Sequence, residues 1–191
     1  MTQVKINVRS NVKQARAKLK HDRRAVDTAA ARAINRTLTM MVTEFSRQIR
    51  GRYTVKAKST KRRIKVTRRA RHNSLIGIVQ AEGRPLALLD FSARVGKRGV
   101  TVKIKKGGTR RRIPGAFRIE RAVPLVVARG RYRNNEFRFQ TARLPVTKLV
   151  GPGVPQMFED ADIQAHMGRF GQRVFARRFD HELRRLVGQR I

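Results

Sequence analysis

The sequence predicts an α+β fold in which a long N-terminal helix and a C-terminal helix pack on a mainly antiparallel β-sheet. Apolar residues recur at helical spacing near both ends of the chain, whereas the central part alternates with period two. Short connections separate the central apolar runs and suit antiparallel strands, because parallel strands need long crossovers. The chain has 191 residues, 40% of them hydrophobic, which is enough for one domain with a real core. We therefore expect a single domain over residues 1–191.

The N-terminal part of the chain predicts a short strand and then a long helix. Residues 4–8 alternate apolar and polar side chains, and Ser10-Asn11 can cap the helix that follows. The apolar residues of this helix keep helical spacing: Val12, Ala15, Leu19, Val26, Ala30, Ala33, Ile34, Leu38, Met41, Val42, Phe45 and Ile49. We expect a break near His21-Asp22 and a C-terminal cap at Gly51, because glycine reaches positive φ. The heptad pattern is not kept strictly, so we favour a buried brace over a coiled coil.

The centre of the chain, at about residues 64–130, predicts a basic antiparallel β-meander. Short apolar runs there start at Ile64, Leu75, Leu86, Val100 and Leu125. Turn-forming residues separate the runs at residues 72–74, 83–85, 96–99, 107–108 and 129–130. We expect each of these turns to join neighbouring strands directly.

Proline and glycine are concentrated in the connecting segments at residues 110–158, which contain five of the six prolines. Proline fixes φ, and glycine reaches conformations that other residues avoid. These residues therefore set the direction of the chain at defined points between short strands.

The C-terminal part predicts a second long helix. Five of the twelve acidic residues lie within residues 159–182, and negative charge at Glu159–Asp162 favours a helix start. The apolar residues of one helix face are Ile163, Met167, Phe170, Val174, Phe175, Phe179, Leu183 and Leu186. We expect this face to pack on the first helix or on the sheet.

Positive charge is the outlying property of the composition. There are 47 Lys and Arg against 12 Asp and Glu, which gives a formal net charge of +35. Charge of one sign at this density repels itself, so we expect nucleic acid or an acidic protein surface as a partner. Residues 45–81 contain no acidic residue, and we call their basic residues the basic belt: Arg47, Arg50, Arg52, Lys56, Lys58, Lys61, Arg62, Arg63, Lys65, Arg68, Arg69 and Arg71.

The basic belt is expected to contact an anion without reading sequence. No helix-turn-helix, zinc-finger or RNA-binding strand motif accompanies it, and only Tyr53 lies among its basic residues. We therefore expect contact with backbone phosphate, and no local carboxylate is expected to offset the charge. A solvated face without a ligand is the simpler alternative.

Several classes of function are not expected from this sequence. Cysteine is absent, which excludes disulfides, thiolate metal sites and cysteine nucleophiles. The four histidines form no i, i+4 pair, and no phosphate-binding loop or serine nucleophile motif is present. No run of apolar residues reaches the ~20 residues that a membrane helix needs. We expect no enzyme activity, no cofactor, no bound metal and no membrane partner.

Three segments give the chain a resemblance to a known family. They are Ile113-Pro114-Gly115-Ala116-Phe117, Leu144-Pro145-Val146 and Gly151-Pro152-Gly153-Val154-Pro155-Gln156-Met157. In this order they resemble the minor tail protein Z family of tailed bacteriophages. The specific segments lie between about residues 84 and 158, and the chain departs from the family in its very high arginine content.

The resemblance implies a structural protein of the virion tail, assembled in the host cytoplasm. It implies a place near the head-tail junction, where the protein completes the tail and supports retention and passage of DNA. It also implies a hexameric ring that contacts the tail terminator, the tail tube and connector proteins. We expect the basic belt to face or flank the DNA channel, or to meet an acidic neighbouring ring. We assign subunit docking to Pro114, Gly115, Phe117, Pro145, Gly151, Pro152, Pro155 and Met157.

Composition alone also fits a different class of protein. A free, sequence-nonspecific nucleic-acid-binding protein, ribosomal-like or nucleoid-like, has the same excess of Lys and Arg. The Pro/Gly framework and the two long helices favour a rigid part of an assembly instead.

Overall fold

The computed structural model describes residues 9–18, 23–120, 124–134, 136–141 and 143–188. The predicted strand at residues 4–8 and the predicted break at His21-Asp22 lie outside these residues.

The helices are α1 (Arg9–Lys18), α2 (Arg23–Arg52), α3 (Ala57–Arg63), α4 (Val154–Phe158) and α5 (Ala161–Gly188), with a short 3-10 helix η2 (Leu88–Asp90). The strands are β1 (Ile64–Arg68), β2 (Ile78–Ala81), β3 (Pro85–Ala87), β4 (Arg94–Gly96), β5 (Gly99–Val102), β6 (Arg111–Ile113), β7 (Phe117–Ile119), β8 (Leu125–Arg133), β9 (Glu136–Phe139), β10 (Val146–Lys148) and β11 (Val150–Gly153).

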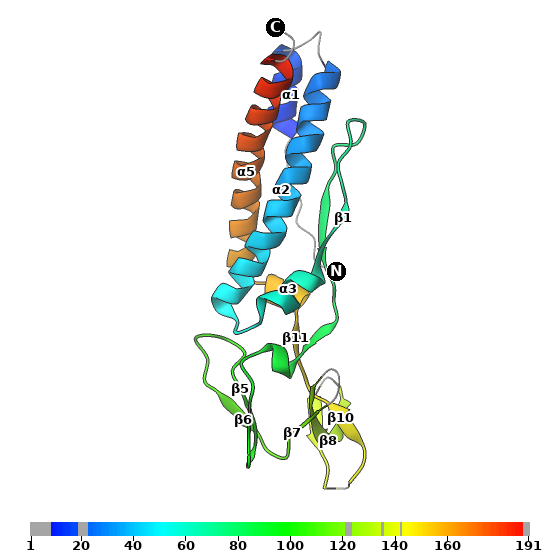
Figure 1. Cartoon of the computed structure of the whole chain (residues 1–191), viewed down its shortest axis with the longest axis vertical. Helices are drawn as coiled ribbons and strands as arrows, with labels where there is room; N and C mark the ends of the chain where they lie inside the picture. Colours follow the sequence, from blue (N-terminus) through cyan, green and yellow to red (C-terminus); the bar gives the residue numbers. More distant parts are fainter. Residues whose placement is uncertain (1–8, 19–22, 121–123, 135, 142, 189–191) are drawn as a thin grey trace.

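Two long antiparallel helices, α2 and α5, form one half of an elongated molecule, and α1 packs beside them (Figure 1). Contacts between them follow the antiparallel order, because Glu44 meets His166 and Arg32 meets Glu182. The predicted apolar faces are the buried ones, from Val26 to Ile49 on α2 and from Ile163 to Phe179 on α5. Fully buried alanines in the first half of α2 let the neighbouring helices approach closely. The predicted α+β fold class is confirmed.

The ends of the N-terminal helices differ from the prediction. Helix α1 already begins at Arg9, so the predicted cap at Ser10-Asn11 lies inside its first turn. Helix α2 runs through Gly51 to Arg52, and Gly51 is not among the glycines with positive φ. The predicted cap at Gly51 is therefore wrong. The chain turns instead at Tyr53, whose backbone N–H still donates to the carbonyl oxygen of Ile49 at 2.8 Å.

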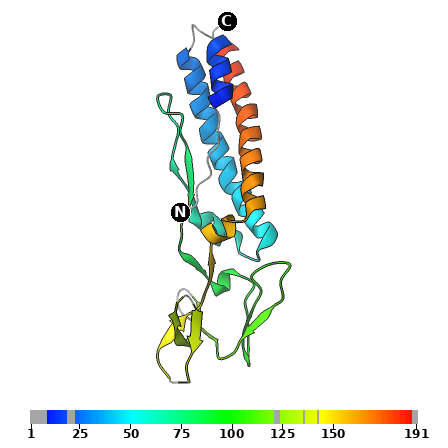
Figure 2. The same ribbon diagram turned by 180° about the vertical axis from the view of Figure 1, so that it is seen from behind.

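The β1–β2 hairpin extends from α3 and lies along one side of α2 (Figures 1 and 2). The amide of Asn35 on α2 fixes the hairpin, because it donates to the carbonyl oxygen of Ala70 and accepts from the N–H of Ala70, both at 2.9 Å. The turn predicted at residues 72–74 closes this hairpin, where Arg71 pairs with Ser74.

The remaining strands lie beyond the C-terminal end of α2 (Figure 1). All pairings between the described strands are antiparallel, but the strands are divided among four small sheets. Strands β4–β5–β6 form one sheet, β10–β8–β7 with β9 form another, and β3–β11 joins them to the helices. Because each sheet is small, the two long helices cover each other more than they cover a sheet.

The predicted turn at Arg129-Gly130 is wrong, because β8 continues to Arg133 and the turn follows at Asn134. Gly130 has φ +140° and pairs with Phe139 within the hairpin. A Cβ atom there would lie 2.1 Å from the carbonyl oxygen of Arg138, so only glycine fits at this position. The glycine signal in the sequence therefore marks a close cross-strand approach and not a turn.

The segment around α4 ties the sheets to the helix pair. Phe158 is buried, and its ring centroid lies 4.0 Å from that of Phe45 on α2. Met157 and Val154 are fully buried in the same core cluster. Gly151 in β11 lies directly against Phe91, where a Cβ atom would be 2.6 Å from the ring. Gly153 and Pro155 of this segment are buried as well, whereas Gly151 and Pro152 are half-buried.

Candidate functional site

The basic belt follows the end of α2, the helix α3 and the strand β1. All twelve of its side chains are exposed or half-buried. The belt does not form one compact patch, because the β1–β2 hairpin carries Arg68, Arg69 and Arg71 back beside Asn35. Asn35 and Arg52 are separated along α2 by about 25 Å at 1.5 Å per residue. Only the central part of the belt therefore contributes to a single site.

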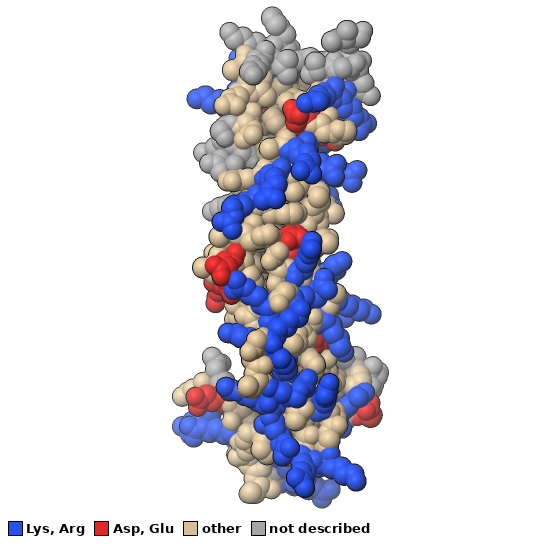
Figure 3. Space-filling model, turned by 90° about the vertical axis from the view of Figure 1, so that its left-hand side faces the viewer, with Lys and Arg blue, Asp and Glu red and all other residues tan. Residues whose placement is uncertain are grey.

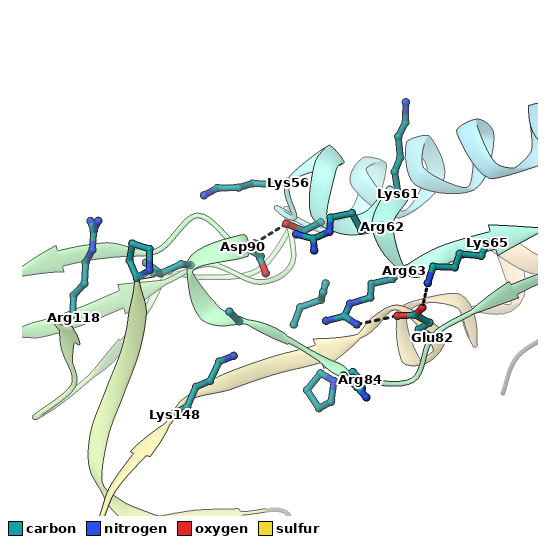
Figure 4. Close-up of a pocket in the computed structure, with 16 residues that line it drawn as sticks. Lys56, Lys61, Arg62, Arg63, Lys65, Glu82, Arg84, Asp90, Arg118 and Lys148 are labelled. Carbon is teal, nitrogen blue, oxygen red and sulfur yellow. Dashed lines mark hydrogen bonds and ion pairs between the residues drawn. The ribbon is translucent and has the colours of Figure 1, made fainter. Parts of the chain in front are cut away.

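A basic groove lies where α3 and β1 meet the strands of the other half (Figure 4). Its cavity volume is about 910 Å³. Its charged lining residues are Lys56, Lys61, Arg62, Arg63, Lys65, Glu82, Arg84, Asp90, Arg118 and Lys148. Eight of these ten side chains are cationic, so the groove is strongly positive.

Three hydrogen bonds hold α3 at the edge of the groove. The N–H of Lys56, just before α3, donates to the carbonyl oxygen of Asp90 at 2.9 Å. The hydroxyl of Ser59 donates to the carboxylate of Asp90 at 2.6 Å. At the other end of α3, the N–H of Glu82 donates to the carbonyl oxygen of Arg63 at 2.7 Å. The positive side chains therefore project from a fixed backbone.

Glu82 neutralises one end of the groove. Its carboxylate lies 2.5 Å from the amine of Lys65 and 3.0 Å from the guanidinium of Arg63 (Figure 4). Hydrogen bonds from Lys65 and then from Arg63 lower the pKa of Glu82 below its usual value. Glu82 is thus negatively charged at neutral pH and occupies these two cations.

Five cations of the groove remain available to a ligand. Within the described part of the chain, no carboxylate lies within 4.0 Å of the charged groups of Lys56, Lys61, Arg62, Arg84 and Lys148. The side chain of Lys61 points away from the other four (Figure 4). The guanidinium of Arg118 instead pairs with Glu120 at 2.8 Å. An anion in the groove would therefore meet Lys56, Arg62, Arg84 and Lys148.

Carboxylates from outside the acid-free interval pair with four residues of the belt. Arg63 and Lys65 share Glu82, and Arg47 lies 3.9 Å from Glu44. Arg52 binds both Asp160 and Asp162 at the start of α5. Glu44 and Glu82 flank the acid-free interval in the sequence. Folding brings Asp160 and Asp162 to the belt from the start of α5.

The Arg52 cluster joins the two long helices. Desolvation raises the pKa of Asp160, but hydrogen bonds from Arg52 and from the N–H of Asp162 outweigh it and lower the pKa. The same carboxylates raise the pKa of Arg52. We conclude that Arg52 helps to hold α2 against the start of α5 and is less available to a ligand than the groove cations.

Three cationic residues of the groove lie outside the basic belt that the sequence predicted. Arg84 lies between β2 and β3, Arg118 lies in β7 and Lys148 lies in β10. Each is a single basic residue in a chain rich in them, so no local signal marks it. Only the antiparallel packing of distant strands brings them to the end of α3.

Positive charge also extends beyond the belt. Figure 3 views the molecule from the side of α5 and of β5–β6, and Lys and Arg cover much of this face, most densely in its lower half. Acidic side chains are few and scattered there. The groove is therefore distinguished by its hollow shape and its cationic lining, and not by charge alone.

The residues assigned to subunit docking fall into three groups. Pro114, Gly115, Phe117 and Pro145 are exposed, whereas Gly151 and Pro152 are half-buried. Pro155 and Met157 are buried within the chain. A buried side chain offers no surface to a partner, so Pro155 and Met157 act as packing residues. The exposed four remain candidates for docking.

His166 takes part in a polar contact between α5 and α2. Its Nε2 lies 3.1 Å from the carboxylate of Glu44, which also accepts a hydrogen bond from Gln48 at 2.6 Å. Burial raises the pKa of Glu44, but hydrogen bonds from Gln48 and His166 and the charge of Arg47 outweigh it and lower the pKa. This cluster braces the helix pair and lies apart from the groove lining.

Metal-binding clusters and membrane-spanning helices are both absent from the described residues. No three His, Asp or Glu side chains in this part of the chain lie close enough together to hold a metal ion. None of its helices is both long enough and apolar enough to cross a membrane.

The chain matches the model of a known protein family. A family model described as prophage minor tail protein Z (GPZ) matches residues 10–189, which include both long helices and every residue of the groove. No curated protein and no solved structure matches the chain. The resemblance carried by the Pro/Gly segments is thereby confirmed. The chain belongs to the prophage minor tail protein Z family and is a structural protein of the phage tail.

Proposed function

We propose that this protein completes the tail at its head-proximal end and that its basic groove contacts the phosphate backbone of the DNA that passes there. The observation that carries this proposal is that Lys56, Arg62, Arg84 and Lys148 line one groove and have no carboxylate partners among the described residues. The net charge of +35 adds a long-range attraction for the same ligand.

The groove chemistry suits a DNA conduit. Lys and Arg side chains that neutralise phosphates release counterions, which gives binding that depends strongly on salt but not on sequence. Base readout needs side chains that reach into a DNA groove, and the lining offers no aromatic residue for stacking. Contact of this kind holds a DNA backbone without stopping its passage.

The proposal includes a hexameric ring formed on the tail. Six copies around the tail axis would repeat the groove six times and surround the DNA with positive charge. The partners would be the tail terminator, the tail tube and connector proteins. The exposed docking candidates Pro114, Gly115, Phe117 and Pro145 would lie toward these neighbours.

A groove variant tests this function in assembled phage. It carries Lys56→Gln, Arg62→Gln, Arg84→Gln and Lys148→Gln, and a matched control carries Lys97→Gln, Arg98→Gln, Arg111→Gln and Arg112→Gln on the exposed β4–β6 sheet. Each is supplied in place of the wild-type protein. We expect groove-variant tails to assemble and join heads, with about six copies per tail by quantitative mass spectrometry, as expected of a closed ring. Particles with these tails should retain or eject DNA poorly, and control particles should behave as wild type.

Two other results would point to other functions. If the groove variant fails to join the tail while DNA behaviour in the remaining particles is normal, the groove is a docking site for an acidic tail protein. If the protein is absent from purified wild-type tails and is found instead on host nucleic acid, the free nucleic-acid-binding interpretation replaces this one. Family membership favours the tail over that alternative.

A further inference from the structure

The small sheet of β7, β8, β9 and β10, together with the loop that precedes β10, carries most of the large apolar side chains that the described part of the chain exposes. These are Phe117, Tyr132, Phe139, Leu144 and Val146, with Leu144 72% exposed and Phe139 54% exposed. They fall within thirty residues of a chain whose other large apolar residues are mostly buried. Apolar surface concentrated in this way marks an interaction site.

The β8–β9 hairpin of this sheet has one strongly basic face. Arg131 pairs directly with Arg138, and Arg133 pairs with Glu136, so these side chains lie on the same face. Arg131, Arg133 and Arg138 are exposed, and no carboxylate in the described residues lies within 4.0 Å of their guanidinium groups. Like charges directly opposite each other on a ladder are unfavourable, and an acidic partner would relieve this repulsion.

The other face of the hairpin fixes its position. Phe137 makes edge-on ring contacts with Tyr132 at 5.2 Å and with Phe139 at 4.9 Å, and it packs on the main core. The hydroxyl of Tyr132 accepts a hydrogen bond from the N–H of Val150 at 3.2 Å. Phe137 and the Tyr132 hydroxyl thus hold this face to the rest of the chain, although the rings of Tyr132 and Phe139 on it stay exposed, and the arginine side chains lie on the opposite face.

We propose that this sheet is a docking surface for a different protein, whose surface is apolar at its centre and acidic around it. Arginine beside exposed aromatic and aliphatic side chains is the composition of a protein interface. Leu144, Phe117 and Val146 would supply the apolar contact, and Arg131 and Arg138 the charge. A DNA backbone would use the arginines and leave the apolar side chains without a partner.

A second copy of this chain is a poor occupant of the surface. It carries the same +35 charge, and most acidic side chains of the described residues are already in ion pairs: Asp27, Glu44, Glu82, Glu120, Asp160, Asp162, Asp180 and Glu182. Charge complementarity therefore favours another tail component. This inference uses the tail location that the family gives, and it does not depend on DNA contact by the groove.

Two variants of the sheet test the proposal in tails. One is Arg131→Glu with Arg138→Glu, and its matched control is Arg173→Glu with Arg177→Glu on the exposed face of α5. The other is Leu144→Ser, which leaves the charge unchanged, and its control is Val95→Ser, at a side chain that is 50% exposed. Each protein is supplied in trans to a phage that lacks its own copy, and its amount per purified tail is measured by mass spectrometry. Thermal unfolding of each purified variant confirms that it folds.

We expect the arginine variant to enter tails at least about tenfold less than its control, because a close charge pair becomes a repulsion. Leu144→Ser should reduce entry by a factor of about three to ten, and Val95→Ser should not, since burying a large apolar side chain stabilises an interface. Normal incorporation of both sheet variants would overturn the proposal.

The affinity of each purified protein for a short DNA duplex separates this surface from the groove. The arginine variant should lose no more duplex affinity than its α5 control. A much larger loss, with Leu144→Ser behaving as wild type, would assign the hairpin to nucleic acid and also overturn the proposal. Failure of the groove variant to affect DNA would leave these results unchanged, so the two proposals fail separately.

Discussion

Replacing Gly151 by valine is expected to lower the free energy of unfolding by about 3 kcal/mol or more, at the upper end of overpacking costs. A Cβ atom at this position lies 2.6 Å from Cε2 of Phe91, and the Phe91 ring is fully buried. The ring cannot move aside without opening the core around it. Urea unfolding followed by circular dichroism measures the change.

Gly168→Ala is the matched control for the Gly151 substitution. Gly168 lies in the interior of α5, and a Cβ atom there meets nothing within 4 Å. Alanine should therefore raise the free energy of unfolding by about 0.5–1 kcal/mol through helix propensity. If Gly151→Val unfolds like wild type but fails to enter tails, Gly151 belongs to a docking surface, as the sequence analysis expected.

Replacing Phe158 by alanine is expected to cost about 3–5 kcal/mol of stability, as for other buried phenylalanines. Phe158 is 1% exposed, and its ring lies against Phe45, so it joins α4 to α2. The matched control is Phe139→Ala in the exposed sheet, which should cost less than about 1 kcal/mol because its ring is largely solvated. Equal losses of stability in the two variants would show that the packing of α4 on α2 does not stabilise the core.

The helices and their buried faces were predictable from the sequence. Apolar spacing identifies both long helices. A helix that packs on a neighbour buries one face, and the residues of that face recur every 3.6 positions in the sequence. The acidic start of α5 was also predictable, and Asp160 accepts a hydrogen bond from the N–H of Asp162 there. The pairing of α2 with α5 was one of two options that the sequence left open.

Glycine was the least reliable local signal. Gly51 lies inside α2, Gly130 lies inside β8, and Gly151 lies against an aromatic ring. In each case a tertiary contact or the continuing hydrogen-bond ladder determines the backbone conformation. The presence of glycine alone does not determine it. The same reason explains why Pro155 and Met157 were assigned to docking although they are buried.

The groove could be predicted only in part. The cluster of basic residues from Lys56 to Lys65 predicted a positively charged surface, and these residues form one wall of the groove. The opposite wall comes from isolated residues on β7 and β10, and the carboxylates that neutralise part of the belt include Glu82, just after β2, and Asp162, at the start of α5. Contacts between residues far apart in the sequence leave no pattern in a single chain.

The salt dependence of duplex affinity tests the central claim, contact between the groove and a phosphate backbone, most directly. Wild type, the groove variant and the β4–β6 control are titrated with duplexes of about 30 base pairs in two unrelated sequences, and each neutralised phosphate contributes a slope of about −0.9 to log K against log salt. We predict equal affinity for the two sequences, and a slope for the groove variant that is shallower than that of wild type by about 3–4, since four cations are removed. The β4–β6 control should lose much less slope. If the groove variant and the control lose equal slope, the duplex senses only the total charge of the protein, and the groove is not its binding site.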